Sequence, residues 1–141
     1  MKKKKLVTSI SYDFYLLGIV CRAKEYKLAW HLNKSGFFDL EKRGDIVIKF
    51  KDKSSLVICN YVCESDFHLH ALLRNKLVKG NGRNQMLLPD LPQFDFFLKL
   101  HSRVIDFQFD DVISAIRKIP EIEYLLKLDV NKIKQKENLL Y

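Results

Sequence analysis

The chain has 141 residues, of which 48% are hydrophobic and 30% charged, with five glycines and three prolines. This composition is typical of one folded globular domain and excludes a disordered or collagen-like chain. The formal net charge is +8, and the run Lys2–Lys5 contributes four of these charges. An excess of positive charge favours an acidic partner, such as RNA, an acidic protein or anionic lipid, without choosing among them.

The N-terminal segment has a partial likeness to an export signal, because lysines precede the apolar run Leu16–Cys21. Asp13 interrupts the approach to this run, and Val20 stands where a small residue should precede a lipoprotein-type cysteine, so we expect a cytoplasmic protein. The sequence has no apolar stretch close to the ~20 residues of a membrane span, and we expect no membrane insertion. The three cysteines, an odd number, are typical of reduced thiols.

The first half of the chain changes its periodicity once. Residues 6–21 are apolar on both alternating faces, which predicts a strand covered on both sides, although a buried helix has the same short-range pattern. Residues 23–34 have the period of an amphipathic helix that Gly36 is placed to end. The predicted buried stripe of this helix consists of Tyr26, Ala29, Trp30 and Asn33, flanked by Leu28 and Leu32. Its predicted solvent face carries the charges of Lys24, Glu25, Lys27 and Lys34.

The second half contains mostly strands. Residues 46–50, 56–63 and 67–74 predict three strands whose short polar turns force antiparallel neighbours, followed by a polar glycine-rich loop at 79–84. In a strand over 94–101, one face is predicted to hold Phe94, Phe96, Leu98 and Leu100, and the other Asp95, Phe97, Lys99 and His101. Asp110 and Asp111 begin a helix over 110–119 that Pro120 ends. Residues 122–128 predict a last strand, after which Asp129 is placed to cap a short turn.

The order β-α-β-β-β-β-α-β predicts an α+β fold, with a mostly antiparallel sheet of five to six strands and two main helices packed on a face. The sequence has no internal repeat and no composition shift that would indicate a domain boundary. We therefore expect a single α+β domain over residues 1–141. Residues 1–5 are expected to be a disordered lysine tail and residues 131–141 a C-terminal tail.

A double-proline turn runs from Leu88 to Phe96 and resembles the signature of the IPExxxVDY family of small uncharacterised bacterial proteins, known chiefly from the Bacteroidetes lineage. Pro89 and Asp95 match the signature literally, while Asp90 replaces its glutamate and Phe96 its tyrosine. Further segments similar to the family pattern are Asp13-Phe14, Leu17-Gly18-Ile19, Tyr26 through Leu32-Asn33, and Lys136 through Tyr141. The family has no established biochemical activity, so the resemblance implies a bacterial cytoplasmic protein and little about its chemistry.

One group of side chains has the ligand types of a zinc site, namely Cys59, Cys63, His68 and His70. A hairpin turn at Glu64-Ser65 would place Tyr61 opposite His68 and Cys59 opposite His70. Cys63 lies about 13 Å from Cys59 along an extended strand, too far to share one zinc ion. We therefore expect ordinary cross-strand packing here, and predict neither a metal nor a cofactor.

Acid–base pairs are equally sparse in the sequence. His101 and Asp95 are separated by about 20 Å along one strand, beyond hydrogen-bond reach. Neither a serine nor a cysteine stands in a nucleophile elbow. No catalytic residue is predicted, and we expect the protein not to be an enzyme.

These observations favour a non-enzymatic binding or adaptor protein that belongs to a larger complex through protein–protein contacts. The candidate docking residues are Leu139, Leu140 and Tyr141, which could dock on a partner or, as is commoner for such a segment, on the sheet of their own domain. The alternative is an RNA- or ribosome-associated basic protein, with contacts from Arg74, Lys76, Lys79, Arg83, Lys132, Lys134 and Lys136. Phe37, Phe38 and Tyr61 could stack on bases if they are exposed. A second alternative is a small enzyme or metal-binding protein.

Overall fold

The computed structural model describes residues 14–44, 46–49, 55–58, 60–75, 86–102, 109–133 and 139. Its elements follow one another along the chain as β1 (Tyr15–Cys21), α1 (Glu25–Lys34), β2 (Glu41–Lys42), β3 (Ile46–Lys49), β4 (Ser55–Ile58), β5 (Asn60–Glu64), β6 (His68–Arg74), β7 (Phe96–Ser102), α2 (Phe109–Arg117), β8 (Ile122–Leu128) and the 3-10 helix η1 (Val130–Lys132).

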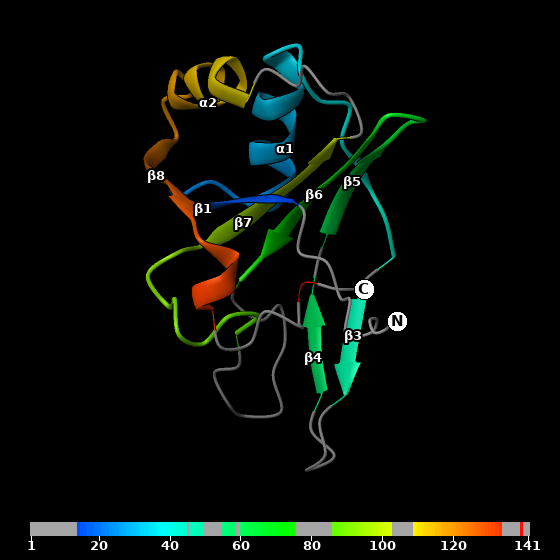
Figure 1. The fold of residues 1–141 in the computed structure, drawn as a ribbon, viewed down its shortest axis with the longest axis vertical. Coiled ribbons are helices and arrows are strands. Elements are labelled where there is room, and N and C mark those ends of the chain that lie inside the picture. Colours follow the sequence, from blue (N-terminus) through cyan, green and yellow to red (C-terminus); the bar gives the residue numbers. More distant parts are fainter. Residues whose placement is uncertain are drawn as a thin grey trace, which may run out of the picture.

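Six strands form one sheet in the order β2-β5-β6-β7-β1-β8, and every pairing is antiparallel. The helices α1 and α2 lie together over one part of this sheet (Figure 1). The predicted α+β class, with a six-stranded antiparallel sheet and two helices, is therefore confirmed. The strands β3 and β4 pair separately, and Figure 1 shows this ribbon extending away from the six-stranded sheet.

The sheet has a hydrophobic core on each face, because apolar side chains alternate to both sides of its central strands. We call the core beneath the helices the helix-side core; it includes Leu17, Ile19, Leu28, Leu32, Leu72, Phe96, Leu98, Leu100, Val112, Ile116 and Leu125. The opposite core includes Phe14, Leu16, Ala71, Leu73, Leu87, Leu88, Phe94, Phe97, Val130, Ile133 and Leu139. The prediction that the first strand is covered on both sides is confirmed for β1.

The buried face of α1 differs from the predicted stripe. Leu28, Ala29 and Leu32 are buried against the sheet, whereas Tyr26 is 62% exposed and Trp30 is 53% exposed. A helix turns about 100° per residue, so positions 26 and 30 lie about 160° around the axis from position 28. A stripe centred on the leucines therefore leaves both aromatic side chains in solvent.

The end of α1 follows the prediction. The backbone N–H of Gly36 donates to the Asn33 carbonyl at 3.2 Å, and Gly36 has a φ of +90°. This left-handed conformation favours glycine, because a Cβ would clash with the backbone there. Gly36 thus ends the helix as expected.

In the turn before β7, one side chain lies on the other face of the sheet from the one predicted. Phe96 belongs to the helix-side core, as predicted, but Phe94 lies in the opposite core with its ring centroid 5.9 Å from that of Phe97. The prediction for Phe94 was wrong because this residue precedes β7, where the alternation of a strand does not apply. At the other end of the chain the Asp129 side chain accepts a hydrogen bond from the Asn131 N–H at 3.1 Å, which confirms the predicted cap.

Candidate functional site

The exposed face of α1 combines aromatic rings with lysines. We define the α1 aromatic surface as Tyr26, Lys27, Trp30 and Lys34, all of which are exposed. Residues 26 and 30, four positions apart, are neighbours on a helix surface. The Lys34 ammonium lies 4.3 Å from the centre of the Trp30 ring, a cation–π contact. The surface therefore offers apolar contact area and positive charge together.

The predicted burial of Tyr26 and Trp30 was wrong, whereas Lys27 and Lys34 are exposed, as predicted. The signal that distinguishes the two faces is the compact set of aliphatic residues at positions 28, 29 and 32, which by itself fills one helical stripe. A stripe fitted to these three residues alone leaves Tyr26 and Trp30 outside it.

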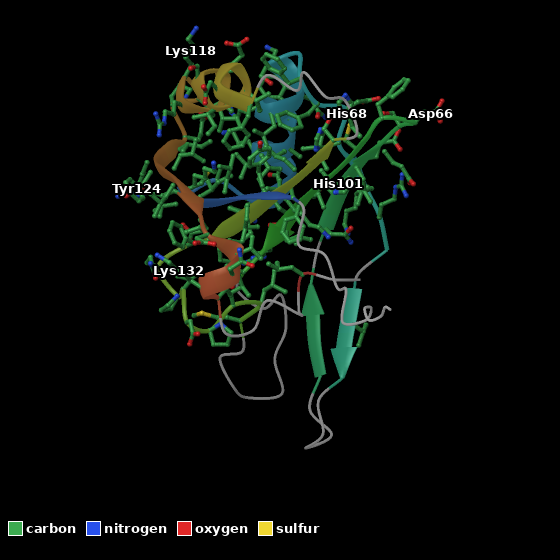
Figure 2. All side chains as sticks on the ribbon, viewed as in Figure 1. Asp66, His68, His101, Lys118, Tyr124 and Lys132 are labelled. Carbon is green, nitrogen blue, oxygen red and sulfur yellow. The ribbon has the colours of Figure 1, made fainter. Side chains whose placement is uncertain are left out.

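The basic residues predicted to contact an anionic partner are only partly within the structure. Arg74 ends β6 half-buried, with its Nη1 atom 3.5 Å from Oε2 of Glu25 at the start of α1. Lys132 lies exposed in η1 (Figure 2). The other predicted contacts lie outside the described residues: Lys76, Lys79, Arg83, Lys134 and Lys136. Of the predicted basic contacts, the structure thus describes only Arg74 and Lys132, and these two do not form a basic patch.

The predicted stacking residues lie in different environments. Phe37 is exposed just beyond α1, but Phe38 is buried in the helix-side core, and Tyr61 is partly buried against it. The expectation that Phe38 stacks on bases is incompatible with this burial. Its ring instead meets the His70 ring edge to face, with 5.6 Å between the ring centroids.

The predicted docking residue Leu139 is fully buried in the opposite core. Its carbonyl oxygen accepts a hydrogen bond from the Lys99 ammonium at 2.7 Å. The Leu139 side chain therefore packs in the core of its own domain and is not on the surface. Leu140 and Tyr141 lie outside the described residues.

A pocket of about 600 Å³ opens where β1 ends and α1 begins, and its walls include Cys21, Glu25, Arg74 and Asp95. Arg74 and Glu25 pair with each other, and the Asp95 Oδ2 atom accepts the Cys21 N–H at 2.9 Å. Burial raises the pKa of the Cys21 thiol, and the nearby carboxylates of Asp95, Glu121 and Glu123 raise it further. A protonated thiol is a poor nucleophile, so the raised pKa does not favour a reactive Cys21.

The candidate zinc ligands meet in a different register from the one predicted. Cys63 lies opposite His70 and Tyr61 opposite Leu72, so the strands are shifted by four residues relative to the prediction. The turn comes later than Glu64-Ser65, because the Ser65 N–H bonds to the His68 carbonyl and Asp66 lies at the tip (Figure 2). The shift brings Cys63, rather than Cys59, beside the histidine; Cys59 lies outside the described residues.

His70 is held as a neutral, buried imidazole. Its Nδ1 atom accepts the backbone N–H of His101 at 3.2 Å, and its ring stacks on that of His68 with 5.1 Å between centroids. Burial, together with the positive charge that His68 and His101 can carry, lowers the pKa of His70 to about 4. Within the described part of the chain, no three His, Cys, Asp or Glu side chains are grouped to hold a metal ion.

The side chain of Asn75, for which the sequence predicted no role, forms hydrogen bonds that hold the double-proline turn. The Asn75 amide donates to the carbonyls of Leu91 and Phe94 at 3.0 and 2.9 Å, and its Oδ1 atom accepts the Leu88 N–H at 2.9 Å. Phe96 is buried, whereas Pro89 and Asp90 are exposed. The side chain of Asn75 therefore holds the turn at the end of β6.

Comparisons of the chain with protein-family models, with curated proteins and with solved structures found no match. The resemblance to the IPExxxVDY family stays a prediction. No helix among the described residues has both the length and the apolar character that crossing a membrane requires.

Proposed function

We propose that this chain is a non-enzymatic binding protein of the adaptor type, which joins a protein complex through the α1 aromatic surface. The observation that carries the proposal is the exposure of Tyr26 and Trp30 side by side on one helix. Tyrosine and tryptophan are enriched among the residues that dominate the energy of protein interfaces. A helix presenting anchors four residues apart is also a recurring form of protein recognition.

The chemistry of the surface indicates the class of partner. Lys27 and Lys34 border the rings, and the exposed Lys24 lies at the start of the same helix. A protein segment that places apolar side chains against the rings and carboxylates against the lysines matches both properties. We therefore expect an acidic and partly apolar protein surface as the partner.

An RNA partner is the alternative, because rings and lysines also recognise unpaired bases. The net charge of +8 supports it. The contact between Lys34 and Trp30 favours protein, since the ammonium occupies one face of the indole that a base would otherwise stack on. Affinity for RNA falls steeply with salt, whereas an apolar contact depends on salt weakly.

The test is an affinity purification of the tagged full chain from the cells that produce it, with and without nuclease. The variant Tyr26→Ala/Trp30→Ala removes both rings, and Phe67→Ala removes one from the β5–β6 turn, where the side chain is 60% exposed. We expect a stoichiometric protein partner that survives nuclease, is retained by Phe67→Ala and is lost by the double variant. Loss of the partner on nuclease treatment, or its retention by the double variant, would contradict the proposal.

A further inference from the structure

The two edges of the six-stranded sheet are built differently. At one edge, β2 has two residues, Glu41 and Lys42, both charged and exposed. At the other edge, β8 has seven residues, and no strand in the described part of the chain pairs with its outer side. Short charged edges resist pairing with another chain, whereas a long edge strand offers a row of backbone groups to one. Among the residues that the structure describes, the edge at β8 is thus the one that leaves room for a further strand.

The exposed face of β8 is apolar. Tyr124 is 53% exposed and Leu126 is 40% exposed, and both lie on the same face of the strand because they are two residues apart. Figure 2 shows Tyr124 pointing away from the body of the domain beside β8. In the described part of the chain, β8 therefore has one edge without a pairing strand, together with exposed apolar side chains whose burial is favourable.

The sequence of β8 is symmetric in its chemistry about Leu125. It reads Ile122-Glu123-Tyr124-Leu125-Leu126-Lys127-Leu128, so one acidic and one basic residue stand at equal distances from the centre. Such a strand is complementary to an antiparallel copy of itself, which is the requirement for a two-fold symmetric interface. A partner strand of unrelated sequence would not require this symmetry.

We infer that β8 pairs antiparallel with β8 of a second copy of this chain, with Leu125 on the two-fold axis, to form a continuous twelve-stranded sheet. In this register Tyr124 lies opposite Leu126 of the second copy. Glu123, the extra residue of β8 where its pairing with β1 shifts between Val20 and Cys21, comes nearest to Lys127 of the second copy. Both contacts occur twice by symmetry. Opposite charges and aromatic–aliphatic pairs directly across two strands stabilise their pairing.

Other registers are less complementary. A shift of two residues in one direction places Glu123 opposite Asp129 of the second copy, which are like charges, and in the other direction opposite Leu125. A shift of one residue would place Tyr124 and Leu126 of one copy on the opposite side of the sheet from those of the other copy. Within one chain, Glu123 forms an ion pair with Arg22 at 2.7 Å. This pair competes only weakly with an ion pair across the two copies, because the Arg22 side chain is 88% exposed.

The inference is tested by sedimentation velocity on the purified full chain over a concentration series. The variants are Glu123→Lys, Lys127→Glu and the charge swap Glu123→Lys/Lys127→Glu, all at exposed positions. Each single variant places like charges opposite each other twice, so we expect its dimer to weaken by at least about tenfold. The charge swap restores both opposite-charge pairs and should recover the dimer.

A mixture of the two single variants provides the sharpest control. Each is expected to be monomeric alone, but together they place two lysines opposite two glutamates and should form a mixed dimer. Uniform nitrogen-15 labelling of one variant gives the two chains different masses, so that native mass spectrometry identifies the mixed dimer. Leu126→Lys should also weaken the dimer, because it removes the apolar pairs. Circular dichroism establishes that each variant is folded.

A wild-type chain that stays monomeric throughout the series overturns the inference. A dimer that the single variants leave unchanged also overturns it, since that dimer would use another surface. Failure of both the charge swap and the mixture to associate would refute the register centred on Leu125.

Discussion

The Asp95 carboxylate accepts a hydrogen bond from the backbone N–H of Cys21, with 2.9 Å between Oδ2 and N. The contact lies where the pairing of β1 with β8 shifts its register between Val20 and Cys21. The backbone N–H of Asp95 also donates to the Ile19 carbonyl, and its carbonyl accepts the Asn75 N–H, each at 2.9 Å. Asp95 therefore joins the double-proline turn to the ends of β1 and β6.

Replacing this carboxylate should destabilise the fold. We expect Asp95→Ala to lower the free energy of unfolding by about 1–3 kcal/mol, because the Cys21 N–H loses its acceptor. Asp95→Asn, which keeps an oxygen, should cost less. Urea denaturation measures both, and Asp90→Ala, exposed in the same turn, is the control with a change within about 0.5 kcal/mol. An equal loss for Asp90→Ala would refute this role of Asp95.

Asn75 should be among the most sensitive polar positions. Asn75→Ala removes three side-chain hydrogen bonds. The Leu91 and Phe94 carbonyls lose a donor, and the Leu88 N–H loses its acceptor. We expect a loss of about 2–4 kcal/mol in the free energy of unfolding. Asn75→Asp retains the acceptor but neither donor, and should also destabilise the fold. Stability unchanged in both variants, measured by thermal or urea denaturation, would contradict this interpretation.

Gly18 leaves room for the Phe94 ring. A Cβ built on Gly18 would lie 2.7 Å from Cδ1 of Phe94, which is itself buried. We expect Gly18→Ala to cost about 1–3 kcal/mol, since the ring must move within a packed core. In the Phe94→Leu background the same substitution should cost less, and a double-mutant cycle measures the difference. Equal costs in both backgrounds would show that the contact is not the cause.

His70 should make the fold sensitive to mild acid. Its pKa is about 4 in the folded chain against 6.5 for an unperturbed histidine, so below pH 6.5 the unfolded chain binds a proton that the folded chain does not. The free energy of unfolding should therefore fall by up to about 3 kcal/mol between pH 6.5 and pH 4, and change no further through this group below that range.

The variant His70→Gln isolates this effect, because glutamine does not titrate. Urea denaturation of both chains across this range gives the difference in their free energies of unfolding, in which contributions from the carboxylates cancel. The stability advantage of the wild-type chain should shrink as the pH falls. A difference that does not depend on pH would contradict the burial of a neutral His70.

The fold class was predictable because the periodicity of the sequence changes clearly between its segments. The strand at 122–128 and the helix that ends at Gly36 are examples in which local pattern and final structure agree. The prediction of the α1 face failed because it counted Tyr26 and Trp30 with the apolar residues, although each carries a polar group and is fully buried less often than leucine. Their exposure depends on which stripe fits the sheet, a property of the assembled fold.

The register of the β5–β6 hairpin shows a second limit. A shift by four residues keeps each side chain on its face, so the alternation that predicts the strands cannot choose between turns at Glu64-Ser65 and at Asp66-Phe67. Asn75 was missed for a related reason. Its partners lie 13 to 19 residues away along the chain, and no local pattern indicates that a buried amide will bind them.

Photo-crosslinking in the cells that produce the chain shows whether the α1 aromatic surface binds a protein. A photoreactive amino acid placed at position 30, compared with the same group at position 67, reports what contacts each site. We expect one protein to be crosslinked from position 30 and not from position 67, whether or not nuclease is added. Crosslinking of RNA at position 30, or the same products from both positions, would contradict protein binding by this surface.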